Sequence, residues 1–382
     1  LRAFKAMGVD IEGPVDGKVT VYGVGMSGLS APAGKIDLGN SGTSMRLLAG
    51  LLAGQKFDVE LCGDASLSAR PMKRVTAPLA EMGAKVEAAE AGTPPLKITG
   101  NQALKGFSYQ MPVASAQVKS CCLLAGLYAD GETCVTEPAV TRDHTERMLQ
   151  AFGCEVSVDD ATVCVTGPAK LIAADIDVPA DISSAAFFMV GATIADDSDI
   201  TLQHVGINPT RTGVIEILKL MGADITLSNQ QEAGGEPVAD IRIRSATLNG
   251  IHVPERLVPL AIDEFPALFV AAACAEGQTV VSGAEELRVK ESDRIQVMAD
   301  GLRALGVYAQ ATADGMIING GEIGSGTVHS HDDHRIAMAF AMAALRASGD
   351  IHIEDCDNVN TSFPGFAELA TSCGLSIRVI ND

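Results

Sequence analysis

The sequence predicts a two-domain α/β protein built from repeated units, and three observations lead to this prediction. The chain has 382 residues, which is more than one hydrophobic core usually supports. A glycine that closes a helix recurs at nearly constant spacing. Helices of two kinds, one apolar nearly all round and one amphipathic, occur between these glycines. The 47% content of hydrophobic residues is enough for two sizeable cores.

The repeat consists of a helical run that ends in an apolar residue and a glycine, followed by an alternating strand. Glycine fits the left-handed conformation that closes a helix, and the alternation after it predicts a strand. Consecutive glycines are 68 to 84 residues apart, which is difficult to attribute to chance. The six pairs are Met7-Gly8, Met82-Gly83, Phe152-Gly153, Met221-Gly222, Leu305-Gly306 and Cys373-Gly374.

The apolar helices are rich in Ala, Gly and Ser, so we expect them to be buried and closely packed. Because five such helices accompany six glycines, we expect about 50 to 60 further residues upstream of Leu1. Asn208-Pro209 is a natural boundary, which predicts a first domain at 1–208, with a truncated first repeat, and a second at 209–382. The apolar helices are expected at 42–54, 115–126, 183–195, 263–277 and 333–349.

Composition limits the class of partner. A net charge of −20 argues against nucleic acid or an anionic membrane as a partner. The sequence has no apolar run of the 18 or more residues that would indicate a membrane span, and we recognise no signal peptide in it. The nine cysteines show no C-x-x-C spacing, so we expect reduced thiols and a cytoplasmic location.

Arginines gather at the starts of the predicted helices, although the helix dipole disfavours a cation there. Helix N-termini and guanidinium groups together favour an anion, so the pattern predicts an anionic small-molecule ligand such as a phosphate or carboxylate. Ser183, Asp143 and Thr210, also at helix starts, are interpreted as N-caps. The arginines are Arg46, Arg70, Arg142, Arg294 and Arg335.

Two other motifs are not expected to be sites. Residues 23–28 match G-x-G-x-x-G, but no helix is predicted after them, so the context of a dinucleotide site is absent. Residues 329–334 contain three histidines and two aspartates. Arg335 follows them directly and opposes a bound cation, so we expect a structural or substrate-orienting role and no metal.

Seven motifs along the chain resemble the 5-enolpyruvylshikimate-3-phosphate synthases. The resemblance implies two domains, each with three βαβαββ repeats, and an active site in the interdomain cleft. The motifs are LGNSGTSMR (38–46), SARPMKRV (68–75), MPVASAQVKSCCLLAG (111–126), TRDHTERMLQAFG (141–153), IDEFPALFVAAA (262–273), LRVKESDRI (287–295) and DDHRIAMAF (332–340).

The resemblance implies transfer of the enolpyruvyl group of phosphoenolpyruvate to the 5-hydroxyl of shikimate 3-phosphate, with release of phosphate. The hydroxyl attacks C2 while C3 is protonated, and phosphate then leaves a tetrahedral intermediate. The reaction belongs to aromatic amino acid biosynthesis through the shikimate pathway and needs no metal or organic cofactor. We expect a monomer that acts on these small molecules.

The same resemblance implies roles for individual residues. Asp263 is the candidate base and Glu291 the candidate proton donor. Because Lys290 and Arg294 flank Glu291 and favour its ionised form, its protonation must be coupled to substrate binding. Shikimate 3-phosphate is expected at Ser115, Ala116, Gln117, Arg142, Asp263 and Lys290, and phosphoenolpyruvate at Gly42, Arg70, Gln117, Arg294 and Arg335.

The chain departs from the family pattern at several places. A motif with a Lys, Ser and Arg that touch the ligands would lie upstream of Leu1, so residues 1–382 alone would have little or no activity. Ser115-Ala116-Gln117 and Thr361-Ser362-Phe363-Pro364 resemble the glyphosate-tolerant class, whereas Gly42 leaves space for the inhibitor. We therefore expect intermediate to ordinary sensitivity to glyphosate.

Two other functions stay open at this point. A UDP-N-acetylglucosamine enolpyruvyl transferase also has six repeats, but it uses a catalytic Cys in a mobile loop near the Arg70 segment. The nearest cysteine here is Cys62, in a predicted strand. A non-catalytic anion-binding chain is the other alternative, and binding without turnover would indicate it.

Overall fold

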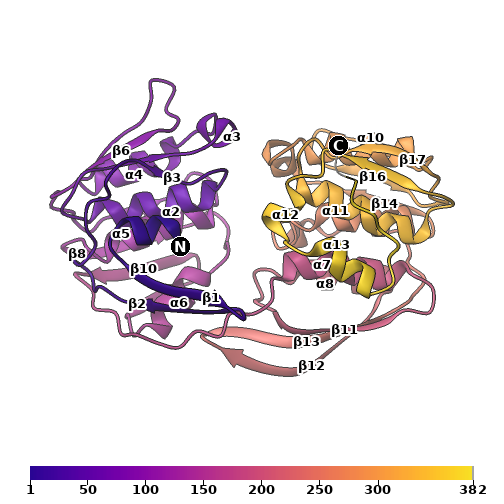
Figure 1. The fold of residues 1–382 in the computed structure, drawn as a ribbon, viewed down its shortest axis with the longest axis horizontal. Coiled ribbons are helices and arrows are strands. Elements are labelled where there is room, and N and C mark those ends of the chain that lie inside the picture. The colour runs from indigo at the N-terminus through magenta and orange to yellow at the C-terminus, as the bar shows by residue number, and fades with distance from the viewer. Residues whose placement is uncertain (381–382) are drawn as a thin grey trace. The chain divides into compact units, whose positions relative to one another are not determined.

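The computed structural model describes residues 1–380 and divides the chain into two compact units, Leu1–Ile176 and Asp177–Asp382 (Figure 1). Each unit has its own hydrophobic core. The first core draws its buried residues from Met7 to Val165, and the second from Ile182 to Leu375. The two-domain α/β prediction is therefore supported by two separate cores.

The division between the units comes earlier than residue 208, where the sequence suggested a boundary. The segment 182–205 contains an apolar helix and a strand, and its buried residues, such as Phe187 and Val205, belong to the second core. A helix that buries its apolar surface in one core belongs to that unit, whatever turn residues follow it.

The first unit contains two complete βαβαββ repeats, where the resemblance implied three in each domain. In each repeat the first two strands pair in parallel, and the two others complete the sheet antiparallel, which gives the orders β3-β4-β6-β5 and β7-β8-β10-β9. The first repeat comprises β3 Ile36–Asp37, α2 Gly42–Ala53, β4 Val59–Cys62, α3 Ala65–Ser68, α4 Lys73–Glu81, β5 Lys85–Glu87 and β6 Leu96–Thr99. The second comprises β7 Ser108–Gln110, α5 Ala116–Gly126, β8 Gly131–Thr136, α6 His144–Ala151, β9 Val156–Asp159 and β10 Thr162–Gly167.

The second unit repeats this order with its first strands reduced to short parallel bridges, such as Ala180 to Val205 and His252 to Val280. The sheet orders are β11-β13-β12 and β14-β16-β15. The elements are α7 Ile182–Ile194, β11 Asp199–Gly206, α8 Gly213–Met221, β12 Asp224–Ala233, β13 Glu236–Arg244, the 3-10 helix η1 Glu255–Leu257, α9 Phe265–Ala273, β14 Gln278–Val281, η2 Glu285–Val289, α10 Arg294–Ala304, β15 Tyr308–Ala311 and β16 Met316–Asn319.

Partial repeats lie at the two ends of the described chain. At the start, α1 is followed by the antiparallel pair β1-β2, and near the end β17 and β18 pair in parallel on either side of α11. These elements are α1 Arg2–Ala6, β1 Asp10–Val15, β2 Lys18–Tyr22, β17 Gly326–His329, α11 His334–Ala343, η3 Ala344–Arg346, β18 Ile351–Glu354, α12 Val359–Ser362 and α13 Phe366–Ser372.

The helix-closing glycines are confirmed. All six have a positive φ, between 76° and 105°, in the region that glycine adopts without a steric penalty. A strand follows each of the first five. After Gly374 the structure has no strand among the described residues, because nothing pairs there with residues 375–380.

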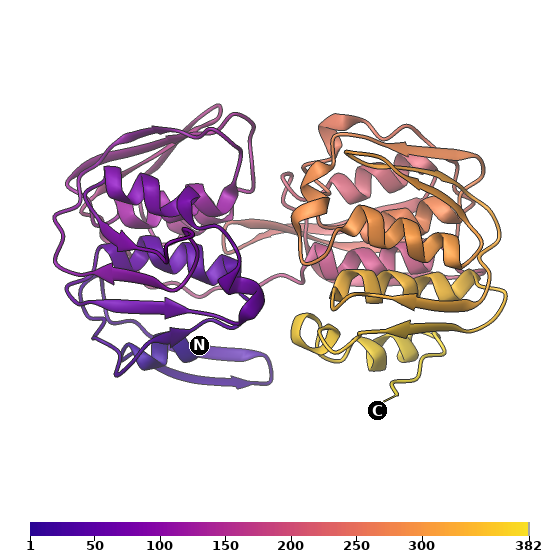
Figure 2. The same cartoon turned by 90° about the horizontal axis from the view of Figure 1, so that it is seen from above.

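The apolar helices are buried as predicted, and the sheets lie around them in each unit (Figure 2). In the first unit α2 packs on α5. A Cβ at Gly50 would lie 2.1 Å from the carbonyl oxygen of Cys121, so only glycine allows this approach of the two helices. In the second unit α7, α9 and α11 pack against one another.

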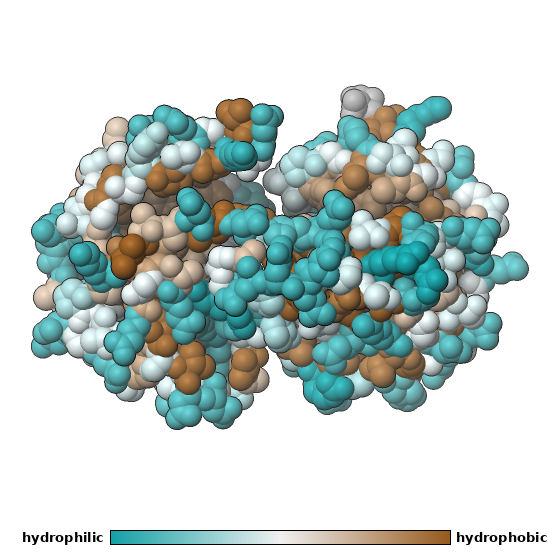
Figure 3. All heavy atoms as spheres, turned by 90° about the horizontal axis from the view of Figure 1, so that it is seen from below, coloured by the Kyte–Doolittle hydropathy of each residue, from teal (hydrophilic) through white to brown (hydrophobic). Residues whose placement is uncertain are grey.

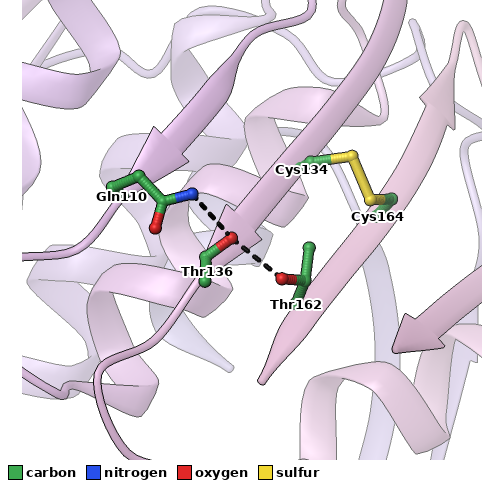
Figure 4. Close-up of a disulfide and its surroundings, with 5 residues drawn as sticks. All are labelled: Gln110, Cys134, Thr136, Thr162 and Cys164. Atoms are coloured by element: carbon green, nitrogen blue, oxygen red, sulfur yellow. Dashed lines mark hydrogen bonds between the residues drawn. A yellow bond between two sulfur atoms is a disulfide. The ribbon is translucent and has the colours of Figure 1, made fainter. Parts of the chain in front are cut away.

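The prediction of reduced thiols is wrong at one pair of cysteines. Cys134 on β8 lies directly opposite Cys164 on β10, and the two form a disulfide (Figure 4). They are separated by 30 residues, with Cα atoms 4.1 Å apart, so strand register brings them together and no local spacing could reveal it. The other seven cysteines are free.

The surface has the mixed character expected of an exposed protein face. Figure 3 shows hydrophilic and hydrophobic side chains on the face in view of each unit. Several large apolar residues are exposed, among them Val15 and Val289, which is ordinary for protein surfaces. In the described part of the chain, every helix is too short or too polar to cross a bilayer.

Candidate active site

The candidate residues of the second unit come together at the starts of three helices. Asp263 lies just before α9, Lys290 ends η2, Arg294 is the first residue of α10, and Arg335 is the second residue of α11. The buried helices α9 and α11 pack on each other, which brings these starts to one end of the unit.

Asp263 contacts the other three residues of this group. Its Oδ1 atom lies 3.3 Å from Nζ of Lys290 and 3.7 Å from Nη1 of Arg294. Its backbone carbonyl accepts a hydrogen bond of 3.0 Å from Nη1 of Arg335. The structure therefore places two predicted site residues, Lys290 and Arg294, at the carboxylate of Asp263, and a third, Arg335, at its backbone carbonyl.

Arg294 and Asp333 form a buried ion pair beside Asp263. Nε of Arg294 donates to Oδ2 of Asp333 at 2.8 Å, and the two residues are 1% and 0% exposed. Burial lowers the pKa of Arg294. Asp333 and the neighbouring carboxylates raise this pKa by more than burial lowers it, so the net shift is upward. Burial likewise raises the pKa of Asp333, and Arg294 outweighs this and lowers it. Both groups are held in their charged forms.

Glu291 also contacts Arg294. Its Oε2 atom accepts from Nη2 of Arg294 at 2.6 Å, and about a third of its side chain is exposed. Its role as proton donor stays a prediction.

In the first unit, the start of α2 carries a group of cations. Ser41 caps the helix by accepting from the backbone N–H of Ser44. A Cβ at Gly42 would lie 3.1 Å from Nη1 of Arg70 and 3.5 Å from Nη1 of Arg46. Arg70 donates to Oδ1 of Asn40 at 2.8 Å. Glycine therefore leaves both guanidinium groups at the exposed start of the helix.

The pKa of Arg46 lies below its ordinary value. Burial lowers it most, and the positive charges of Arg70 and Arg74 lower it further. A helix N-terminus and a group of mutually repelling cations both favour an anion. This is the electrostatic arrangement that the sequence predicted.

Gln117 links this cationic group to helix α5. Its Oε1 atom accepts a short hydrogen bond from Nη1 of Arg46, and its Nε2 donates to Oγ1 of Thr43 at 2.8 Å. Ser115 is the N-cap of α5, where its hydroxyl accepts from Val118 N–H, and Ala116 is the first helical residue. Ser115 is thus both a cap and a candidate ligand residue.

Arg142 lies just before α6, whose N-cap position is held by Asp143. It belongs to the same unit as Ser115 and Gln117 and follows strand β8 by a short loop. Asp143 makes no capping hydrogen bond and pairs instead with Nε of Arg147 at 2.8 Å. The predicted N-cap position of Asp143 is confirmed, but its side chain forms no capping hydrogen bond, so that part of the interpretation is wrong.

The capping interpretation is also wrong for Ser183 and Thr210. Asp181 caps α7, and the hydroxyl of Ser183 donates a short hydrogen bond to the buried Glu264. Thr210 precedes the N-cap position and donates to Oδ1 of Asn208 at 2.7 Å. The Ser183 hydroxyl makes a tertiary contact and the Thr210 hydroxyl a contact within its loop. The position of a Ser or Thr at a helix start does not reveal which of these contacts, or a capping bond, it will make.

A cavity of about 230 Å³ lies at the start of α11. It is lined by Ser183, Ser184, His334, Arg335 and Ser362, among others. Burial lowers the pKa of His334, and the adjacent positive charge of Arg335 lowers it further. The cavity is polar, and both Arg335 and Asp181 line it.

Several residues of these groups were not assigned a role from the sequence. Arg46 was noted at a helix start. Its contact with Gln117, 71 positions later in the chain, joins helices α2 and α5. Asp333 was noted only within the histidine cluster. A buried arginine needs a carboxylate partner, and this need was the signal that could have identified Asp333.

The two motifs that were set aside do not form sites of the kind their patterns suggested. Residues 23–28 follow β2, and the next helix begins only at Gly42, so the helix that a dinucleotide site needs is missing. Asp333 is engaged with Arg294, Ser292 and the backbone of Arg335. Among the described residues, metal-ligand geometry is found at Glu132, Cys134 and Cys164, and both cysteines are in the disulfide.

The βαβαββ repeats and the cationic helix starts place this protein in the class of enolpyruvyl transferases. The sequence matches the family described as EPSP synthase (3-phosphoshikimate 1-carboxyvinyltransferase) over residues 1–369. The chain therefore belongs to the EPSP synthase family, the shikimate-pathway enzymes that the sequence resemblance suggested.

Relatives and solved structures also support membership of this family. The 3-phosphoshikimate 1-carboxyvinyltransferase of Alkalilimnicola ehrlichii is 67% identical, with 99% of this chain and 85% of that protein covered. The enzyme of the same name from Methylococcus capsulatus is 66% identical, with 99% and 87% covered. The solved EPSP synthase of Acinetobacter baumannii is 61% identical with a TM-score of 0.92, and 100% of this chain and 88% of that one are covered.

These findings also bear on the alternative acceptor. Cys62, the cysteine nearest to the Arg70 segment, is the last residue of strand β4, and its Sγ contacts the carbonyl of Ile36. It is held in a sheet, unlike a nucleophile in a mobile loop. The family match favours shikimate 3-phosphate over UDP-N-acetylglucosamine.

Proposed function

We propose that this protein transfers the enolpyruvyl group of phosphoenolpyruvate to the 5-hydroxyl of shikimate 3-phosphate through the residues described above. The hydroxyl oxygen bonds to C2 of phosphoenolpyruvate while C3 takes up a proton. The resulting tetrahedral intermediate loses a proton from C3 and its phosphate leaves, which gives the enolpyruvyl ether and inorganic phosphate. This sequence needs one base, one acid and cations for the phosphates and carboxylates.

Asp263 is the proposed base. The observation that carries the proposal is the convergence of Lys290 and Arg294 on its carboxylate, with Arg335 on its backbone carbonyl. These cations orient the carboxylate and lie where a second anion can bind. A positioned carboxylate can accept the hydroxyl proton as the C–O bond forms.

Glu291 is the proposed acid that protonates C3. Its contact with Arg294 favours the ionised form in the free enzyme. A bound phosphate or carboxylate would compete for Arg294 and release Glu291 to take a proton. Substrate binding and protonation of Glu291 are then coupled.

The remaining residues divide between the two substrates. Phosphoenolpyruvate is assigned to the cations and the glycine at the helix starts, and shikimate 3-phosphate to the polar residues of α5 and the segments around it. The first set is Gly42, Arg70, Gln117, Arg294 and Arg335, and the second is Ser115, Ala116, Gln117, Arg142, Asp263 and Lys290.

We also propose that the protein acts as a cytoplasmic monomer on these small molecules, without a nucleic-acid or membrane partner and without a metal or organic cofactor. The net charge of −20 supports the lack of a nucleic-acid or anionic-membrane partner, because it opposes binding to polyanions. The substrates are themselves anionic, so their binding depends on the local groups of cations.

Replacement of Asp263 by Asn tests the proposed base in the full-length gene product. The amide keeps the shape but cannot accept the proton, so kcat should fall about 10²- to 10⁴-fold. Asp300→Asn is the matched control, since Asp300 is exposed and contacts Arg303 and Gln296 on the same face of α10. An Asp263→Asn enzyme with the kcat of the control would overturn the assignment.

A further inference from the structure

A buried ion triad lies in the first unit, outside the residues assigned to the substrates. Lys119 on α5 is 1% exposed. Its Nζ atom lies 2.8 Å from Oε2 of Glu137 and 2.7 Å from Oε1 of Glu146. Glu137 and Glu146 are also buried, at 5% and 3% exposure.

The triad connects the segments that carry the proposed shikimate 3-phosphate residues. Lys119 is two positions after Gln117 on α5. Glu137 follows strand β8 and accepts hydrogen bonds from the backbone N–H of Thr141, at 3.3 Å, and from its hydroxyl. Thr141 is bonded directly to Arg142. One chain of contacts therefore runs from α5 to Arg142.

Stability does not account for three buried charges. Taking charged groups out of water is costly, and apolar residues of similar size often stabilise a protein as well or better. Glu137 and Glu146 both lie close to Nζ of Lys119, and Glu137 also accepts hydrogen bonds from Thr141. The pair of Lys119 and Glu137 therefore links α5 to the segment that carries Arg142.

We propose that Lys119 and Glu137 are positioning residues that hold Arg142 in the orientation in which it binds shikimate 3-phosphate with the start of α5. This inference rests on the roles proposed above for Ser115, Gln117 and Arg142. Glu137 accepts hydrogen bonds from the backbone N–H and the hydroxyl of Thr141, and Lys119 holds Glu137 against α5. Neither side chain is among the residues assigned to a substrate.

The test separates a positioning role from a structural one by the Michaelis constants of the two substrates. Thr141→Val removes the hydroxyl donor with little change in shape. It should raise the KM for shikimate 3-phosphate about 3- to 10-fold and change that for phosphoenolpyruvate less than about twofold. Glu137→Gln should act in the same direction. The double variant should equal the stronger single variant, because both break one contact.

Two further variants address Lys119 itself. Lys119→Met should raise the same KM by at least as much, since it leaves Glu137 unanchored, and Lys119→Arg should restore it in part. Because Lys119→Met can also impair folding, Thr141→Val is the variant that decides the test. Its melting temperature should fall by only a few degrees, because one hydrogen bond is lost.

Thr145→Val is the matched control. Oγ1 of Thr145 contacts Oγ of Ser120 at 2.7 Å, so it also joins α6 to α5, but it is not linked to Arg142. It should leave both Michaelis constants unchanged. The inference is overturned if Thr141→Val behaves like Thr145→Val, or if it raises both constants equally and lowers the melting temperature by more than a few degrees.

Arg142→Met distinguishes failure of this inference from failure of the proposed function. If Arg142→Met raises the KM for shikimate 3-phosphate and Thr141→Val does not, the positioning role is wrong and the role of Arg142 stands. If Arg142→Met also leaves that constant unchanged, the role of Arg142 is wrong, and the positioning inference falls with it.

Discussion

Nε of Arg294 lies 2.8 Å from Oδ2 of Asp333, and neither side chain is accessible to solvent beyond 1%. This pair anchors the starts of α10 and α11 to each other, because Asp333 is also the N-cap of α11. Arg294 reaches Asp263 and Glu291 from this anchored position. The cation that both candidate catalytic carboxylates share is therefore fixed by a residue outside the proposed chemistry.

Asp333→Asn should destabilise the protein by about 3 kcal/mol or more, because it leaves a buried arginine charge without its principal partner. Chemical denaturation at neutral pH measures this. Asp300→Asn, at an exposed ion pair, should change the free energy of unfolding by less than about 1 kcal/mol. Equal effects of the two variants would show that the buried pair is not an anchor.

His334 should make stability depend on pH. Its pKa in the folded protein is lowered, first by burial and then by Arg335, from about 6.5 in the unfolded chain. The unfolded state therefore binds more protons, so this contribution is fully present above the unfolded value and is lost as pH falls through the folded value. The slope of unfolding free energy between about pH 5 and about pH 7 should decrease in His334→Gln.

His252→Gln is the control for this pH dependence, because His252 is exposed on the same unit. It should keep the slope of the unmodified protein. A slope that is unchanged in His334→Gln as well would refute the linkage.

Gly42→Ala should weaken binding of phosphoenolpyruvate. The new Cβ would lie 3.1 Å from Nη1 of Arg70, so the guanidinium must shift by a few tenths of an ångström. We expect the KM for phosphoenolpyruvate to rise about 3- to 10-fold, with less change in that for shikimate 3-phosphate. Gly34→Ala, where a Cβ meets nothing within 4 Å, is the matched control.

The same glycine bears on inhibition. We expect the full-length enzyme with Gly42 to be inhibited by glyphosate in the millimolar range or below, and Gly42→Ala to need more. Dose-response curves at fixed phosphoenolpyruvate measure this. Full activity of the Gly42 enzyme in millimolar glyphosate would contradict the expectation.

The disulfide should be detectable by counting thiols. Of the nine cysteines, seven are free, so titration in denaturant without reductant should find seven thiols, and nine after reduction. Closing a loop between residues 30 positions apart should stabilise the oxidised form by about 3–4 kcal/mol. Cys134→Ser and Cys164→Ser should each abolish this difference. Nine reactive thiols at the outset would show that the pair is reduced.

The repeat could be predicted from the sequence because it depends on local chemistry. Gly8, Gly83 and the other closing glycines need a positive φ, and the Ala- and Gly-rich helices have no polar face to expose. These features determine which helices are buried before any tertiary contact is known. The arginines at the helix starts were predictable for the same reason, since they oppose the local dipole.

What could not be predicted depends on distant segments meeting. Cys134 and Cys164 are adjacent only through the register of β8 and β10. Arg46 meets Gln117 only because α2 packs on α5, and Ser183 leaves its expected capping role because Glu264 lies beside it. The boundary between the units moved for a similar reason, since α7 buries its apolar surface in the second core.

The most direct test of the central claim is release of inorganic phosphate by the full-length gene product from phosphoenolpyruvate, with each acceptor supplied separately. We predict release that depends on shikimate 3-phosphate, with one enolpyruvyl ether formed per phosphate, unchanged by a metal chelator. Release that requires UDP-N-acetylglucosamine instead, or binding of both substrates without any release, would contradict the account.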